Sequence, residues 1–238
     1  MKRLLSLLLF LPALAGWCQQ TKVIDVGKED IRITASQFYT VGGEPVSNTK
    51  YIRLMSGTPY FSEAWMKGSL DLSNGRGYEN LWLKIDLTDN SLLYLDAEGK
   101  EMIATSVIKN VTLIDSVSGR KYDFVYSSFI SGVGKIQQGW YQVMVSGQVT
   151  LYKHSGKIIN EVKPYGLATY EQSIVTTTSY FLLADSVFLP IKKITALPNM
   201  LKNKKDELDQ YISNKNLSGK SDADYATLIT YYNSFFSK

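Results

Sequence analysis

The chain has 238 residues, and the 45% of them that are apolar suffice to bury one large core or two small ones. Its 26 basic and 22 acidic residues give a net charge of +4, with the lysines scattered along the sequence. This balance excludes a strongly basic protein that binds nucleic acid, and it does not indicate binding to an anionic membrane surface.

Residues 1–18 have the pattern of a secretory signal peptide. Residues 1–3 carry two positive charges, and residues 4–14 form an apolar run without any charge. That run is too short to cross a bilayer as a stable helix, and no later segment reaches the length of a transmembrane helix. We therefore expect cleavage before Gln19 and an exported protein, located in the periplasm, at the outer membrane or outside the cell.

The end of this segment contains Cys18, the only cysteine of the chain. Gly16 and Cys18 supply the small side chains that signal peptidase requires before the cut. Trp17 precedes Cys18 and disfavours lipid attachment, because lipid-modified cysteines follow small residues. Cleavage after Cys18 would leave a mature chain with no disulfide and no cysteine-bound metal.

Residues 19–194 are predicted to form one antiparallel β domain. In residues 81–87, aliphatic side chains alternate with Trp82, Lys84 and Asp86, which is the period of a half-buried strand. Further strands are expected at 92–96, 102–106, 111–115, 121–129, 174–183 and 187–189. Turn signals recur at a spacing of roughly ten residues, which favours a meander folded into a sandwich or open barrel.

A further strand is predicted over residues 140–151. Tyr141, Val143 and Leu151 share one parity in this segment. The same pattern places Gly147 at a bend or a β-bulge within the strand.

Residues 195–238 change to a helical period and are predicted to form a helical hairpin. Ser221 is the expected N-cap of the second helix, with Asp222 and Asp224 in the first turn, where the helix dipole favours acidic residues. The apolar stripes of both helices are expected to pack on the sheet or on each other. The predicted fold class is therefore α+β, mainly β: an antiparallel meander followed by this hairpin.

Few residues are suited to catalysis. His154 is the only histidine, so a zinc site built from histidines is excluded, and no nucleophile-elbow motif accompanies it. We interpret His154 as a turn residue at a strand end. The glycines near Gly132 lack the spacing of a phosphate-binding loop. The sequence therefore predicts no catalytic residue, no metal and no cofactor.

Carboxylates offer the one enzymatic alternative. Five of them gather in the central hairpins, at Asp86, Asp89, Asp96, Glu98 and Glu101. Trp65, Trp82 and Trp140 could stack on sugar rings beside them. A glycoside hydrolase needs two such carboxylates across a cleft, so a carboxylate-dependent hydrolase remains an alternative function.

Four short motifs are spread along the chain: GTPY at residues 57–60, YEN at 78–80, LDQYI at 208–212 and LITYYN at 228–233. They resemble motifs of exported Bacteroidetes proteins that carry no assigned function. The resemblance implies an envelope location and a β-sheet core followed by helices. It implies no active site.

The favoured function is a non-catalytic envelope or secreted module that binds a protein or a glycan. A small outer-membrane barrel is a further alternative, although the helical stripe at the C-terminus is unlike the closing strand of such a barrel. The expected ligand-binding surface is the sheet face that carries Trp82 and Tyr94. Either the C-terminal helices cover Trp82, or it belongs to an exposed aromatic patch that marks an interaction site.

Overall fold

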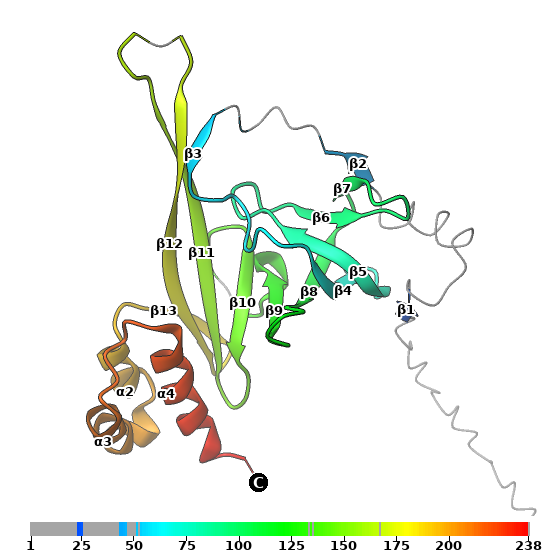
Figure 1. The fold of residues 1–238 in the computed structure, drawn as a ribbon. Helices are drawn as coiled ribbons and strands as arrows, with labels where there is room; N and C mark the ends of the chain where they lie inside the picture. The colour runs from blue at the N-terminus through cyan, green and yellow to red at the C-terminus, as the bar shows by residue number, and fades with distance from the viewer. Residues whose placement is uncertain are drawn as a thin grey trace, which may run out of the picture.

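The computed structural model describes residues 23–25, 43–46, 51, 53–132, 134, 136–166 and 168–237; the predicted signal peptide lies outside them. One sheet of thirteen strands is followed by helices at the C-terminus (Figure 1). The strands are β1 (Val23–Asp25), β2 (Gly43–Pro45), β3 (Leu54–Ser56), β4 (Met66–Leu72), β5 (Gly77–Ile85), β6 (Leu92–Leu95), β7 (Glu101–Ala104), β8 (Ile108–Ile114), β9 (Lys121–Tyr126), β10 (Trp140–Val145), β11 (Thr150–Val162), β12 (Glu171–Ala184) and β13 (Val187–Ile191). The α-helices are α2 (Leu197–Met200), α3 (Lys205–Lys215) and α4 (Asp222–Ser234), and the 3₁₀ turns are η1 (Ser127–Phe129), η2 (Ile194–Ala196) and η3 (Lys202–Lys204).

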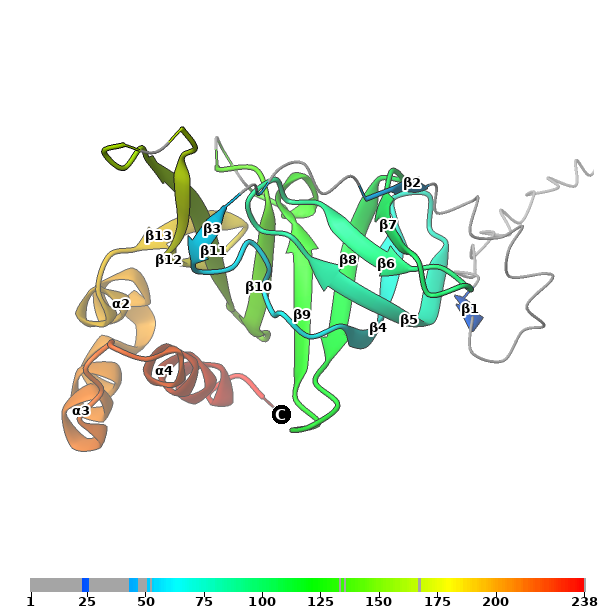
Figure 2. The ribbon, with the colours of Figure 1, turned by 45° about the horizontal axis from the view of Figure 1, so that its top comes forward.

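The sheet consists of two antiparallel meanders, β4–β7 and β8–β13, which the pairing of β4 with β8 joins. The strand order is β13-β12-β11-β10-β9-β8-β4-β5-β6-β7-β2. In Figure 2 the first meander curls across β8 and β9. The predicted class, a mainly β open meander followed by helices, is confirmed. Parallel pairing of β1 with β5 and of β3 with β12 makes the sheet mixed, which the sequence did not indicate.

The first hydrophobic core lies between the two meanders. Leu70 of β4 and Leu83 and Ile85 of β5 pack with Leu113 of β8 and Phe124 of β9. Leu83 and Ile85 are completely buried, so the predicted alternation along β5 is confirmed. Burial of each such aliphatic side chain contributes about 1.5–3 kcal/mol, so this core holds the meanders together in addition to the β4–β8 ladder.

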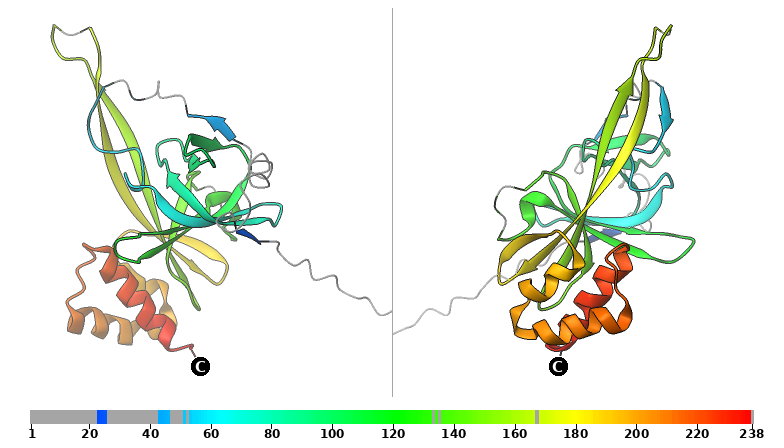
Figure 3. Two further views of the ribbon diagram at one scale, coloured as in Figure 1. Left: turned by 45° about the vertical axis from the view of Figure 1, so that its right-hand side comes forward. Right: turned by 90° about the vertical axis from the view of Figure 1, so that its left-hand side faces the viewer.

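A second core lies between the C-terminal helices and strands β11 and β12 of the longer meander, β8–β13 (Figure 3). Leu151 of β11 and Leu182 of β12 pack with Leu197, Leu208 and Leu228, one from each α-helix. All five side chains are fully buried. The helices therefore pack on the sheet as well as on each other.

The helical boundaries follow the sequence at α4 and depart from it earlier. The Oγ of Ser221 accepts the backbone N–H of Asp224 at 3.2 Å, which confirms the predicted N-cap. The first predicted helix is instead divided, because Leu201 leaves the helical region (φ −107°, ψ 58°) between α2 and η3. α3 ends at the left-handed Asn216, φ 52°. Residues 197–234 thus contain three α-helices, of which α3 and α4 form the predicted hairpin and the short α2 precedes it.

Asp222 ties α4 to the sheet. Its Oδ2 lies 2.6 Å from the Nζ of Lys153, and its Oδ1 accepts the hydroxyl of Tyr180 at 2.5 Å. The Tyr180 ring also stacks on Tyr225 at 4.0 Å between centroids. Burial alone would raise the pKa of Asp222, but the hydrogen bonds from Lys153 and Tyr180 outweigh burial and lower it. The carboxylate therefore stays charged where α4 docks.

The prediction of a single strand over residues 140–151 is wrong. β10 and β11 are two strands of a hairpin, and residues 146–149 form its turn. The side-chain amide of Asn233 on α4 accepts the N–H of Val149 and donates to its carbonyl, both at 3.0 Å. Gly147 faces this amide so closely that a Cβ would lie 2.5 Å from its Nδ2. Of the two predicted alternatives, a bend or a bulge, Gly147 therefore lies at a bend, and it contacts α4 there.

Candidate functional site

Trp82 lies on the outer face of β5. Its neighbours Leu81 and Leu83 point into the core, so the indole points away from the core, and the residue is 40% exposed. The C-terminal helices pack on β11 and β12 of the longer meander, β8–β13, whereas β4 and β5 adjoin this meander at β8 (Figure 1). The helices do not cover Trp82. Of the two expectations, an indole covered by the helices or an indole exposed on the sheet, the structure shows the exposed indole.

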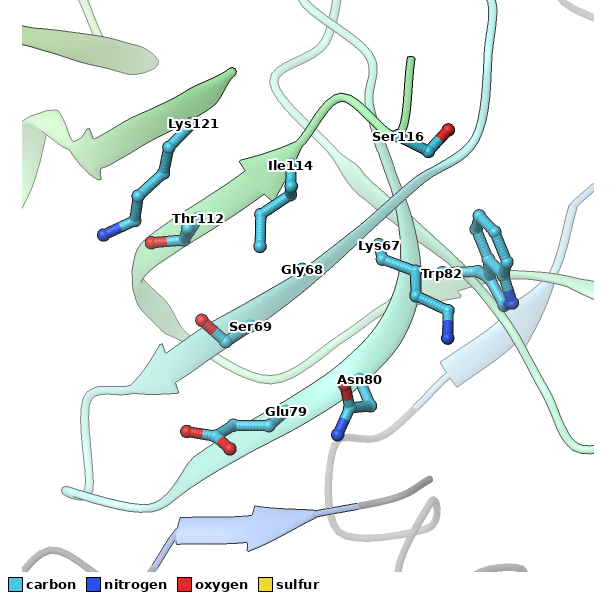
Figure 4. Close-up of a pocket in the computed structure, with 10 residues that line it drawn as sticks. All are labelled: Lys67, Gly68, Ser69, Glu79, Asn80, Trp82, Thr112, Ile114, Ser116 and Lys121. Atoms are coloured by element: carbon cyan, nitrogen blue, oxygen red, sulfur yellow. The ribbon is translucent and has the colours of Figure 1, made fainter. Parts of the chain in front are cut away.

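A shallow hollow of about 500 Å³ opens beside this indole on the outer face of β4, β5 and β8 (Figure 4). Its lining combines one indole and one aliphatic side chain with hydroxyl, amide, carboxylate and ammonium groups. The residues are Lys67, Gly68, Ser69, Glu79, Asn80, Trp82, Thr112, Ile114, Ser116 and Lys121.

Strand register places four of these side chains in one row. Trp82 of β5 is the partner of Lys67 on β4, which pairs on its other side with Ile114 of β8, and Ile114 pairs with Lys121 of β9. Cross-strand partners on one face lie side by side. The Lys67 Nζ lies 5.5 Å from the centre of the indole, within the range of a cation–π contact (Figure 4).

The neighbouring row is polar and internally braced. Ser69 of β4 pairs with Thr112 of β8, and Thr112 pairs with Asp123 of β9. The Thr112 hydroxyl donates to Asp123 Oδ1 at 2.7 Å, and Lys121 Nζ lies 3.2 Å from the same oxygen. Asp123 therefore holds a hydroxyl and an ammonium group at the edge of the hollow.

A bulge in β5 turns two consecutive polar side chains outward. Gly68 is the partner of Leu81 and Leu70 is the partner of Tyr78, so Glu79 and Asn80 together oppose a single residue of β4. Asn80 adopts the left-handed conformation with φ 59°, which asparagine tolerates better than most residues. Both Glu79 and Asn80 are exposed at the hollow, whereas a regular strand would direct one of them inward.

Tyr94 does not share this face, so the expectation of one surface bearing Trp82 and Tyr94 is wrong. Tyr94 of β6 is the partner of Leu83, and cross-strand partners point to the same side of a sheet. Tyr94 is 3% exposed and belongs to the first core, and burial raises the pKa of its phenol. The prediction placed both aromatic residues by strand pattern alone, without the register that sets their relative direction.

The other two indoles of the described residues have structural contacts. Trp140 of β10 is buried, and its Nε1–H donates at 3.0 Å to the carbonyl of Asn90, which lies in the turn between β5 and β6. Trp65 is half-buried, and the Nζ of Lys84 lies 4.6 Å from its ring centre. Trp82 is therefore the most exposed of the three indoles that the structure describes.

The carboxylates considered for catalysis mostly shape turns. Asp86 is buried, and its Oδ1 accepts both the N–H and the hydroxyl of Thr88, at 2.8 and 2.5 Å. Asp89 and Asp96 accept backbone N–H groups of their own turns in the same manner. Among the described residues, no group of three or more His, Cys, Asp or Glu side chains is placed to bind a metal ion.

His154 is not the turn residue that the sequence suggested. It lies within β11, it is 6% exposed, and its ring centre is 4.7 Å from that of Tyr141. The Ser155-Gly156 pair that suggested a turn continues the strand, because Gly156 pairs with Thr177 of β12. Burial lowers the pKa of His154, so the imidazole is neutral in the folded protein at neutral pH.

We expect this burial to make stability depend on pH. Above the ordinary histidine pKa of about 6.5, His154 is neutral in the folded and unfolded states. As the pH falls toward its lowered folded-state pKa, only the unfolded chain binds the proton, and the free energy of unfolding decreases. Urea unfolding of wild type and His154→Phe, measured on both sides of pH 6.5, should show this decrease in the wild type alone. An equal decrease in both proteins would contradict the burial of this side chain.

In the part of the chain that the structure describes, no helix has both the length and the apolar character needed to cross a membrane. Comparisons of the chain with protein-family models, with curated proteins and with solved structures found no match. The geometry of the hollow at Trp82 is thus the basis for a functional assignment.

Proposed function

We propose that this chain is an exported, non-catalytic envelope module that binds a glycan in the hollow beside Trp82. The observation that carries the proposal is the exposed indole on an open sheet face, directly beside a row of hydrogen-bonding side chains. Exposed aromatic residues of this kind often mark interaction sites. The signal-peptide pattern of residues 1–18 supports export.

The shape of the hollow supports an extended ligand. Small-molecule sites are concave and enclose most of the ligand surface, whereas this hollow lies across three strands of an open sheet face (Figure 4). A sugar ring can place its apolar C–H face on the indole of Trp82. Its hydroxyls can then exchange hydrogen bonds with Ser69 and Glu79, which offer a donor and acceptors on the same face.

The charges of the site support a neutral glycan. Lys67 and Lys121 contribute two positive charges, and Glu79 and Asp123 contribute two negative charges on the same face. Because these charges offset one another, long-range attraction of an anionic polymer is weak here. We therefore expect an affinity that changes little with salt concentration.

The test is binding of neutral oligosaccharides of four to six sugar units, derived from glucan, xylan and chitin, measured by isothermal titration calorimetry. We expect Trp82→Ala to weaken binding at least about tenfold, which corresponds to about 1.4 kcal/mol. Its thermal stability should stay near that of the wild type, because the indole is partly exposed. Val117→Ala, at a 95% exposed loop position outside the hollow, is the matched control.

Two outcomes would contradict the proposal. One is equal affinity of wild type and Trp82→Ala for the oligosaccharides, or no binding by either protein. The other is a loss of several kcal/mol of stability in Trp82→Ala, which is the result of truncating a buried core tryptophan.

A further inference from the structure

A gap interrupts the outer edge of β12. β11 pairs with one edge of β12 along its length, from Thr150 opposite Leu183 to Val162 opposite Glu171. β3 and β13 must therefore lie on the other edge (Figure 1). β3 pairs there up to Ser173, and β13 pairs from Tyr180 onward. None of the residues that the structure describes pairs with residues 175–179 on this edge.

The backbone groups that face the gap follow from the neighbouring pairs. The N–H of Gln172 donates to the carbonyl of Arg53 beside β3, at 2.9 Å, so even-numbered residues of β12 direct their backbone groups to this edge. Pro190 of β13, which has no N–H, stands opposite the odd-numbered Phe181, in agreement with this phase. Thr176 and Thr178 thus present two N–H and two C=O groups in the gap.

The gap has the size of one short strand. At about 3.3 Å per residue, its five residues span roughly 17 Å. All five are exposed, and four of them are β-branched. Sheet edges are commonly protected from pairing by charges, proline or bulges, and residues 175–179 contain no charged residue and no proline.

From this gap we propose that an extended segment of a partner protein binds by strand addition, between β3 and β13. Such binding takes its affinity from main-chain hydrogen bonds and its specificity from alternate side chains. The segment would continue an edge that β3 and β13 already occupy on either side. A second copy of the sheet is a poor occupant, because its edge strand would collide with β3 and β13 before it could pair with the gap between them.

The side chains around the gap indicate the sequence of the segment. Ile158 and Val175 are cross-strand partners on the outer face, 52% and 46% exposed, so apolar side chains on that face of the added strand would cover them. On the other face, the Nζ of Lys157 lies 2.9 Å from the hydroxyl of Thr176. The carboxylates of Glu63 and Asp86 already act on this ammonium group, and an acidic or hydroxyl side chain beside Thr176 would add a further partner. The expected segment alternates apolar residues with acidic or hydroxyl residues.

The probes are acetylated pentapeptides in which valine alternates with threonine or glutamate, titrated into the full chain and followed by isothermal titration calorimetry. We expect saturable binding below about 1 mM peptide. Two further peptides are N-methylated, one at the odd-numbered and one at the even-numbered nitrogens. One of them should lose binding and the other should bind like the parent peptide, because only alternate N–H groups face β12. No binding of the parent peptide at this concentration, or equal affinities of the two N-methylated peptides, would overturn the proposal.

Proline variants test the same edge from the side of the protein. Thr178→Pro removes an N–H that faces the gap and should reduce peptide affinity at least tenfold while the thermal midpoint stays near that of the wild type. Thr177→Pro is the matched control, because its N–H faces β11, and it should lower the midpoint. Full peptide affinity in a folded Thr178→Pro would overturn the proposal. If that variant does not fold, the two N-methylated peptides decide.

Two further measurements separate the alternatives. Trp82→Ala should bind the peptides like the wild type, so failure of the glycan proposal and failure of this one are distinguishable. Sedimentation velocity of the protein alone should show no self-association through this edge. A concentration-dependent dimer that Thr178→Pro abolishes would assign the gap to a second copy of the chain and overturn the peptide proposal.

Discussion

Replacing Gly68 by alanine should destabilise the protein by about 3 kcal/mol or more, at the upper end of the usual cost of overpacking. A Cβ at this position would lie 2.0 Å from the backbone carbonyl oxygen of Thr112 and 3.3 Å from the Cδ1 of Leu83. The nearer atom belongs to the backbone of β8 and cannot rotate away. Because the β4–β8 ladder joins the two meanders, any separation there also opens the first core. Denaturant unfolding measures the effect.

Gly134→Ala is the matched control for this prediction. A Cβ there would meet no described atom within 4 Å, and Gly134 does not have a positive φ. We expect its free energy of unfolding to stay within about 0.5 kcal/mol of the wild type. Equal stability of Gly68→Ala and Gly134→Ala would contradict the close approach of β4 to β8.

Replacing Asn233 by alanine should cost about 3 kcal/mol, because it leaves the buried N–H and C=O groups of Val149 without their partner. The Asn233 amide occupies the position of a neighbouring strand beside the β10–β11 turn, and it connects α4 to that turn. Its loss should therefore weaken the attachment of the helices and increase hydrogen exchange at Val149. Chemical unfolding and amide exchange of the same variant measure both effects.

Ser234→Ala serves as the control on the same helix. Ser234 is exposed, and its hydroxyl donates to the carbonyl of Tyr231 within the helix, so its removal should change stability by no more than about 0.5 kcal/mol. If Asn233→Ala were as stable as Ser234→Ala, the connection between α4 and the hairpin would carry no energy, and the assignment would be wrong.

The features that the sequence predicted correctly depend on local patterns. The alternation along β5 and the N-cap at Ser221 involve neighbours a few residues apart, and both are confirmed. The sequence placed a bend at Gly147 but did not show that residues 146–149 form a hairpin turn, because Asn233, which holds this turn, lies 84 positions further along the chain than Val149. The parallel pairs of β1 and β3 were missed because each of these strands has only three residues, too few to show a two-residue period in the sequence.

At the candidate site too, the correct predictions depend on local pattern, and the wrong or missing ones depend on contacts between distant strands. The outward direction of Trp82 followed from the parity of β5 alone. Tyr94 required the register of β6 against β5, which pairs it with the inward Leu83. The lining residues contributed by β4, β8 and β9 depend on the pairing of β4 with β8, whose strands are separated by three intervening strands in the sequence. One local signal was available for the bulge, an asparagine within a strand pattern at Asn80.

The proposal that the Trp82 face binds a glycan is tested most directly by the indole N–H signals in a ¹H–¹⁵N NMR titration with an oligosaccharide that the protein binds. Trp65, Trp82 and Trp140 lie in different surroundings and report separate regions of one sample. We predict that the Trp82 signal shifts in proportion to saturation, while the Trp140 signal stays in place because its indole is buried and donates to Asn90. Saturable binding that moves the Trp65 or Trp140 signal and leaves Trp82 unchanged would contradict the proposal.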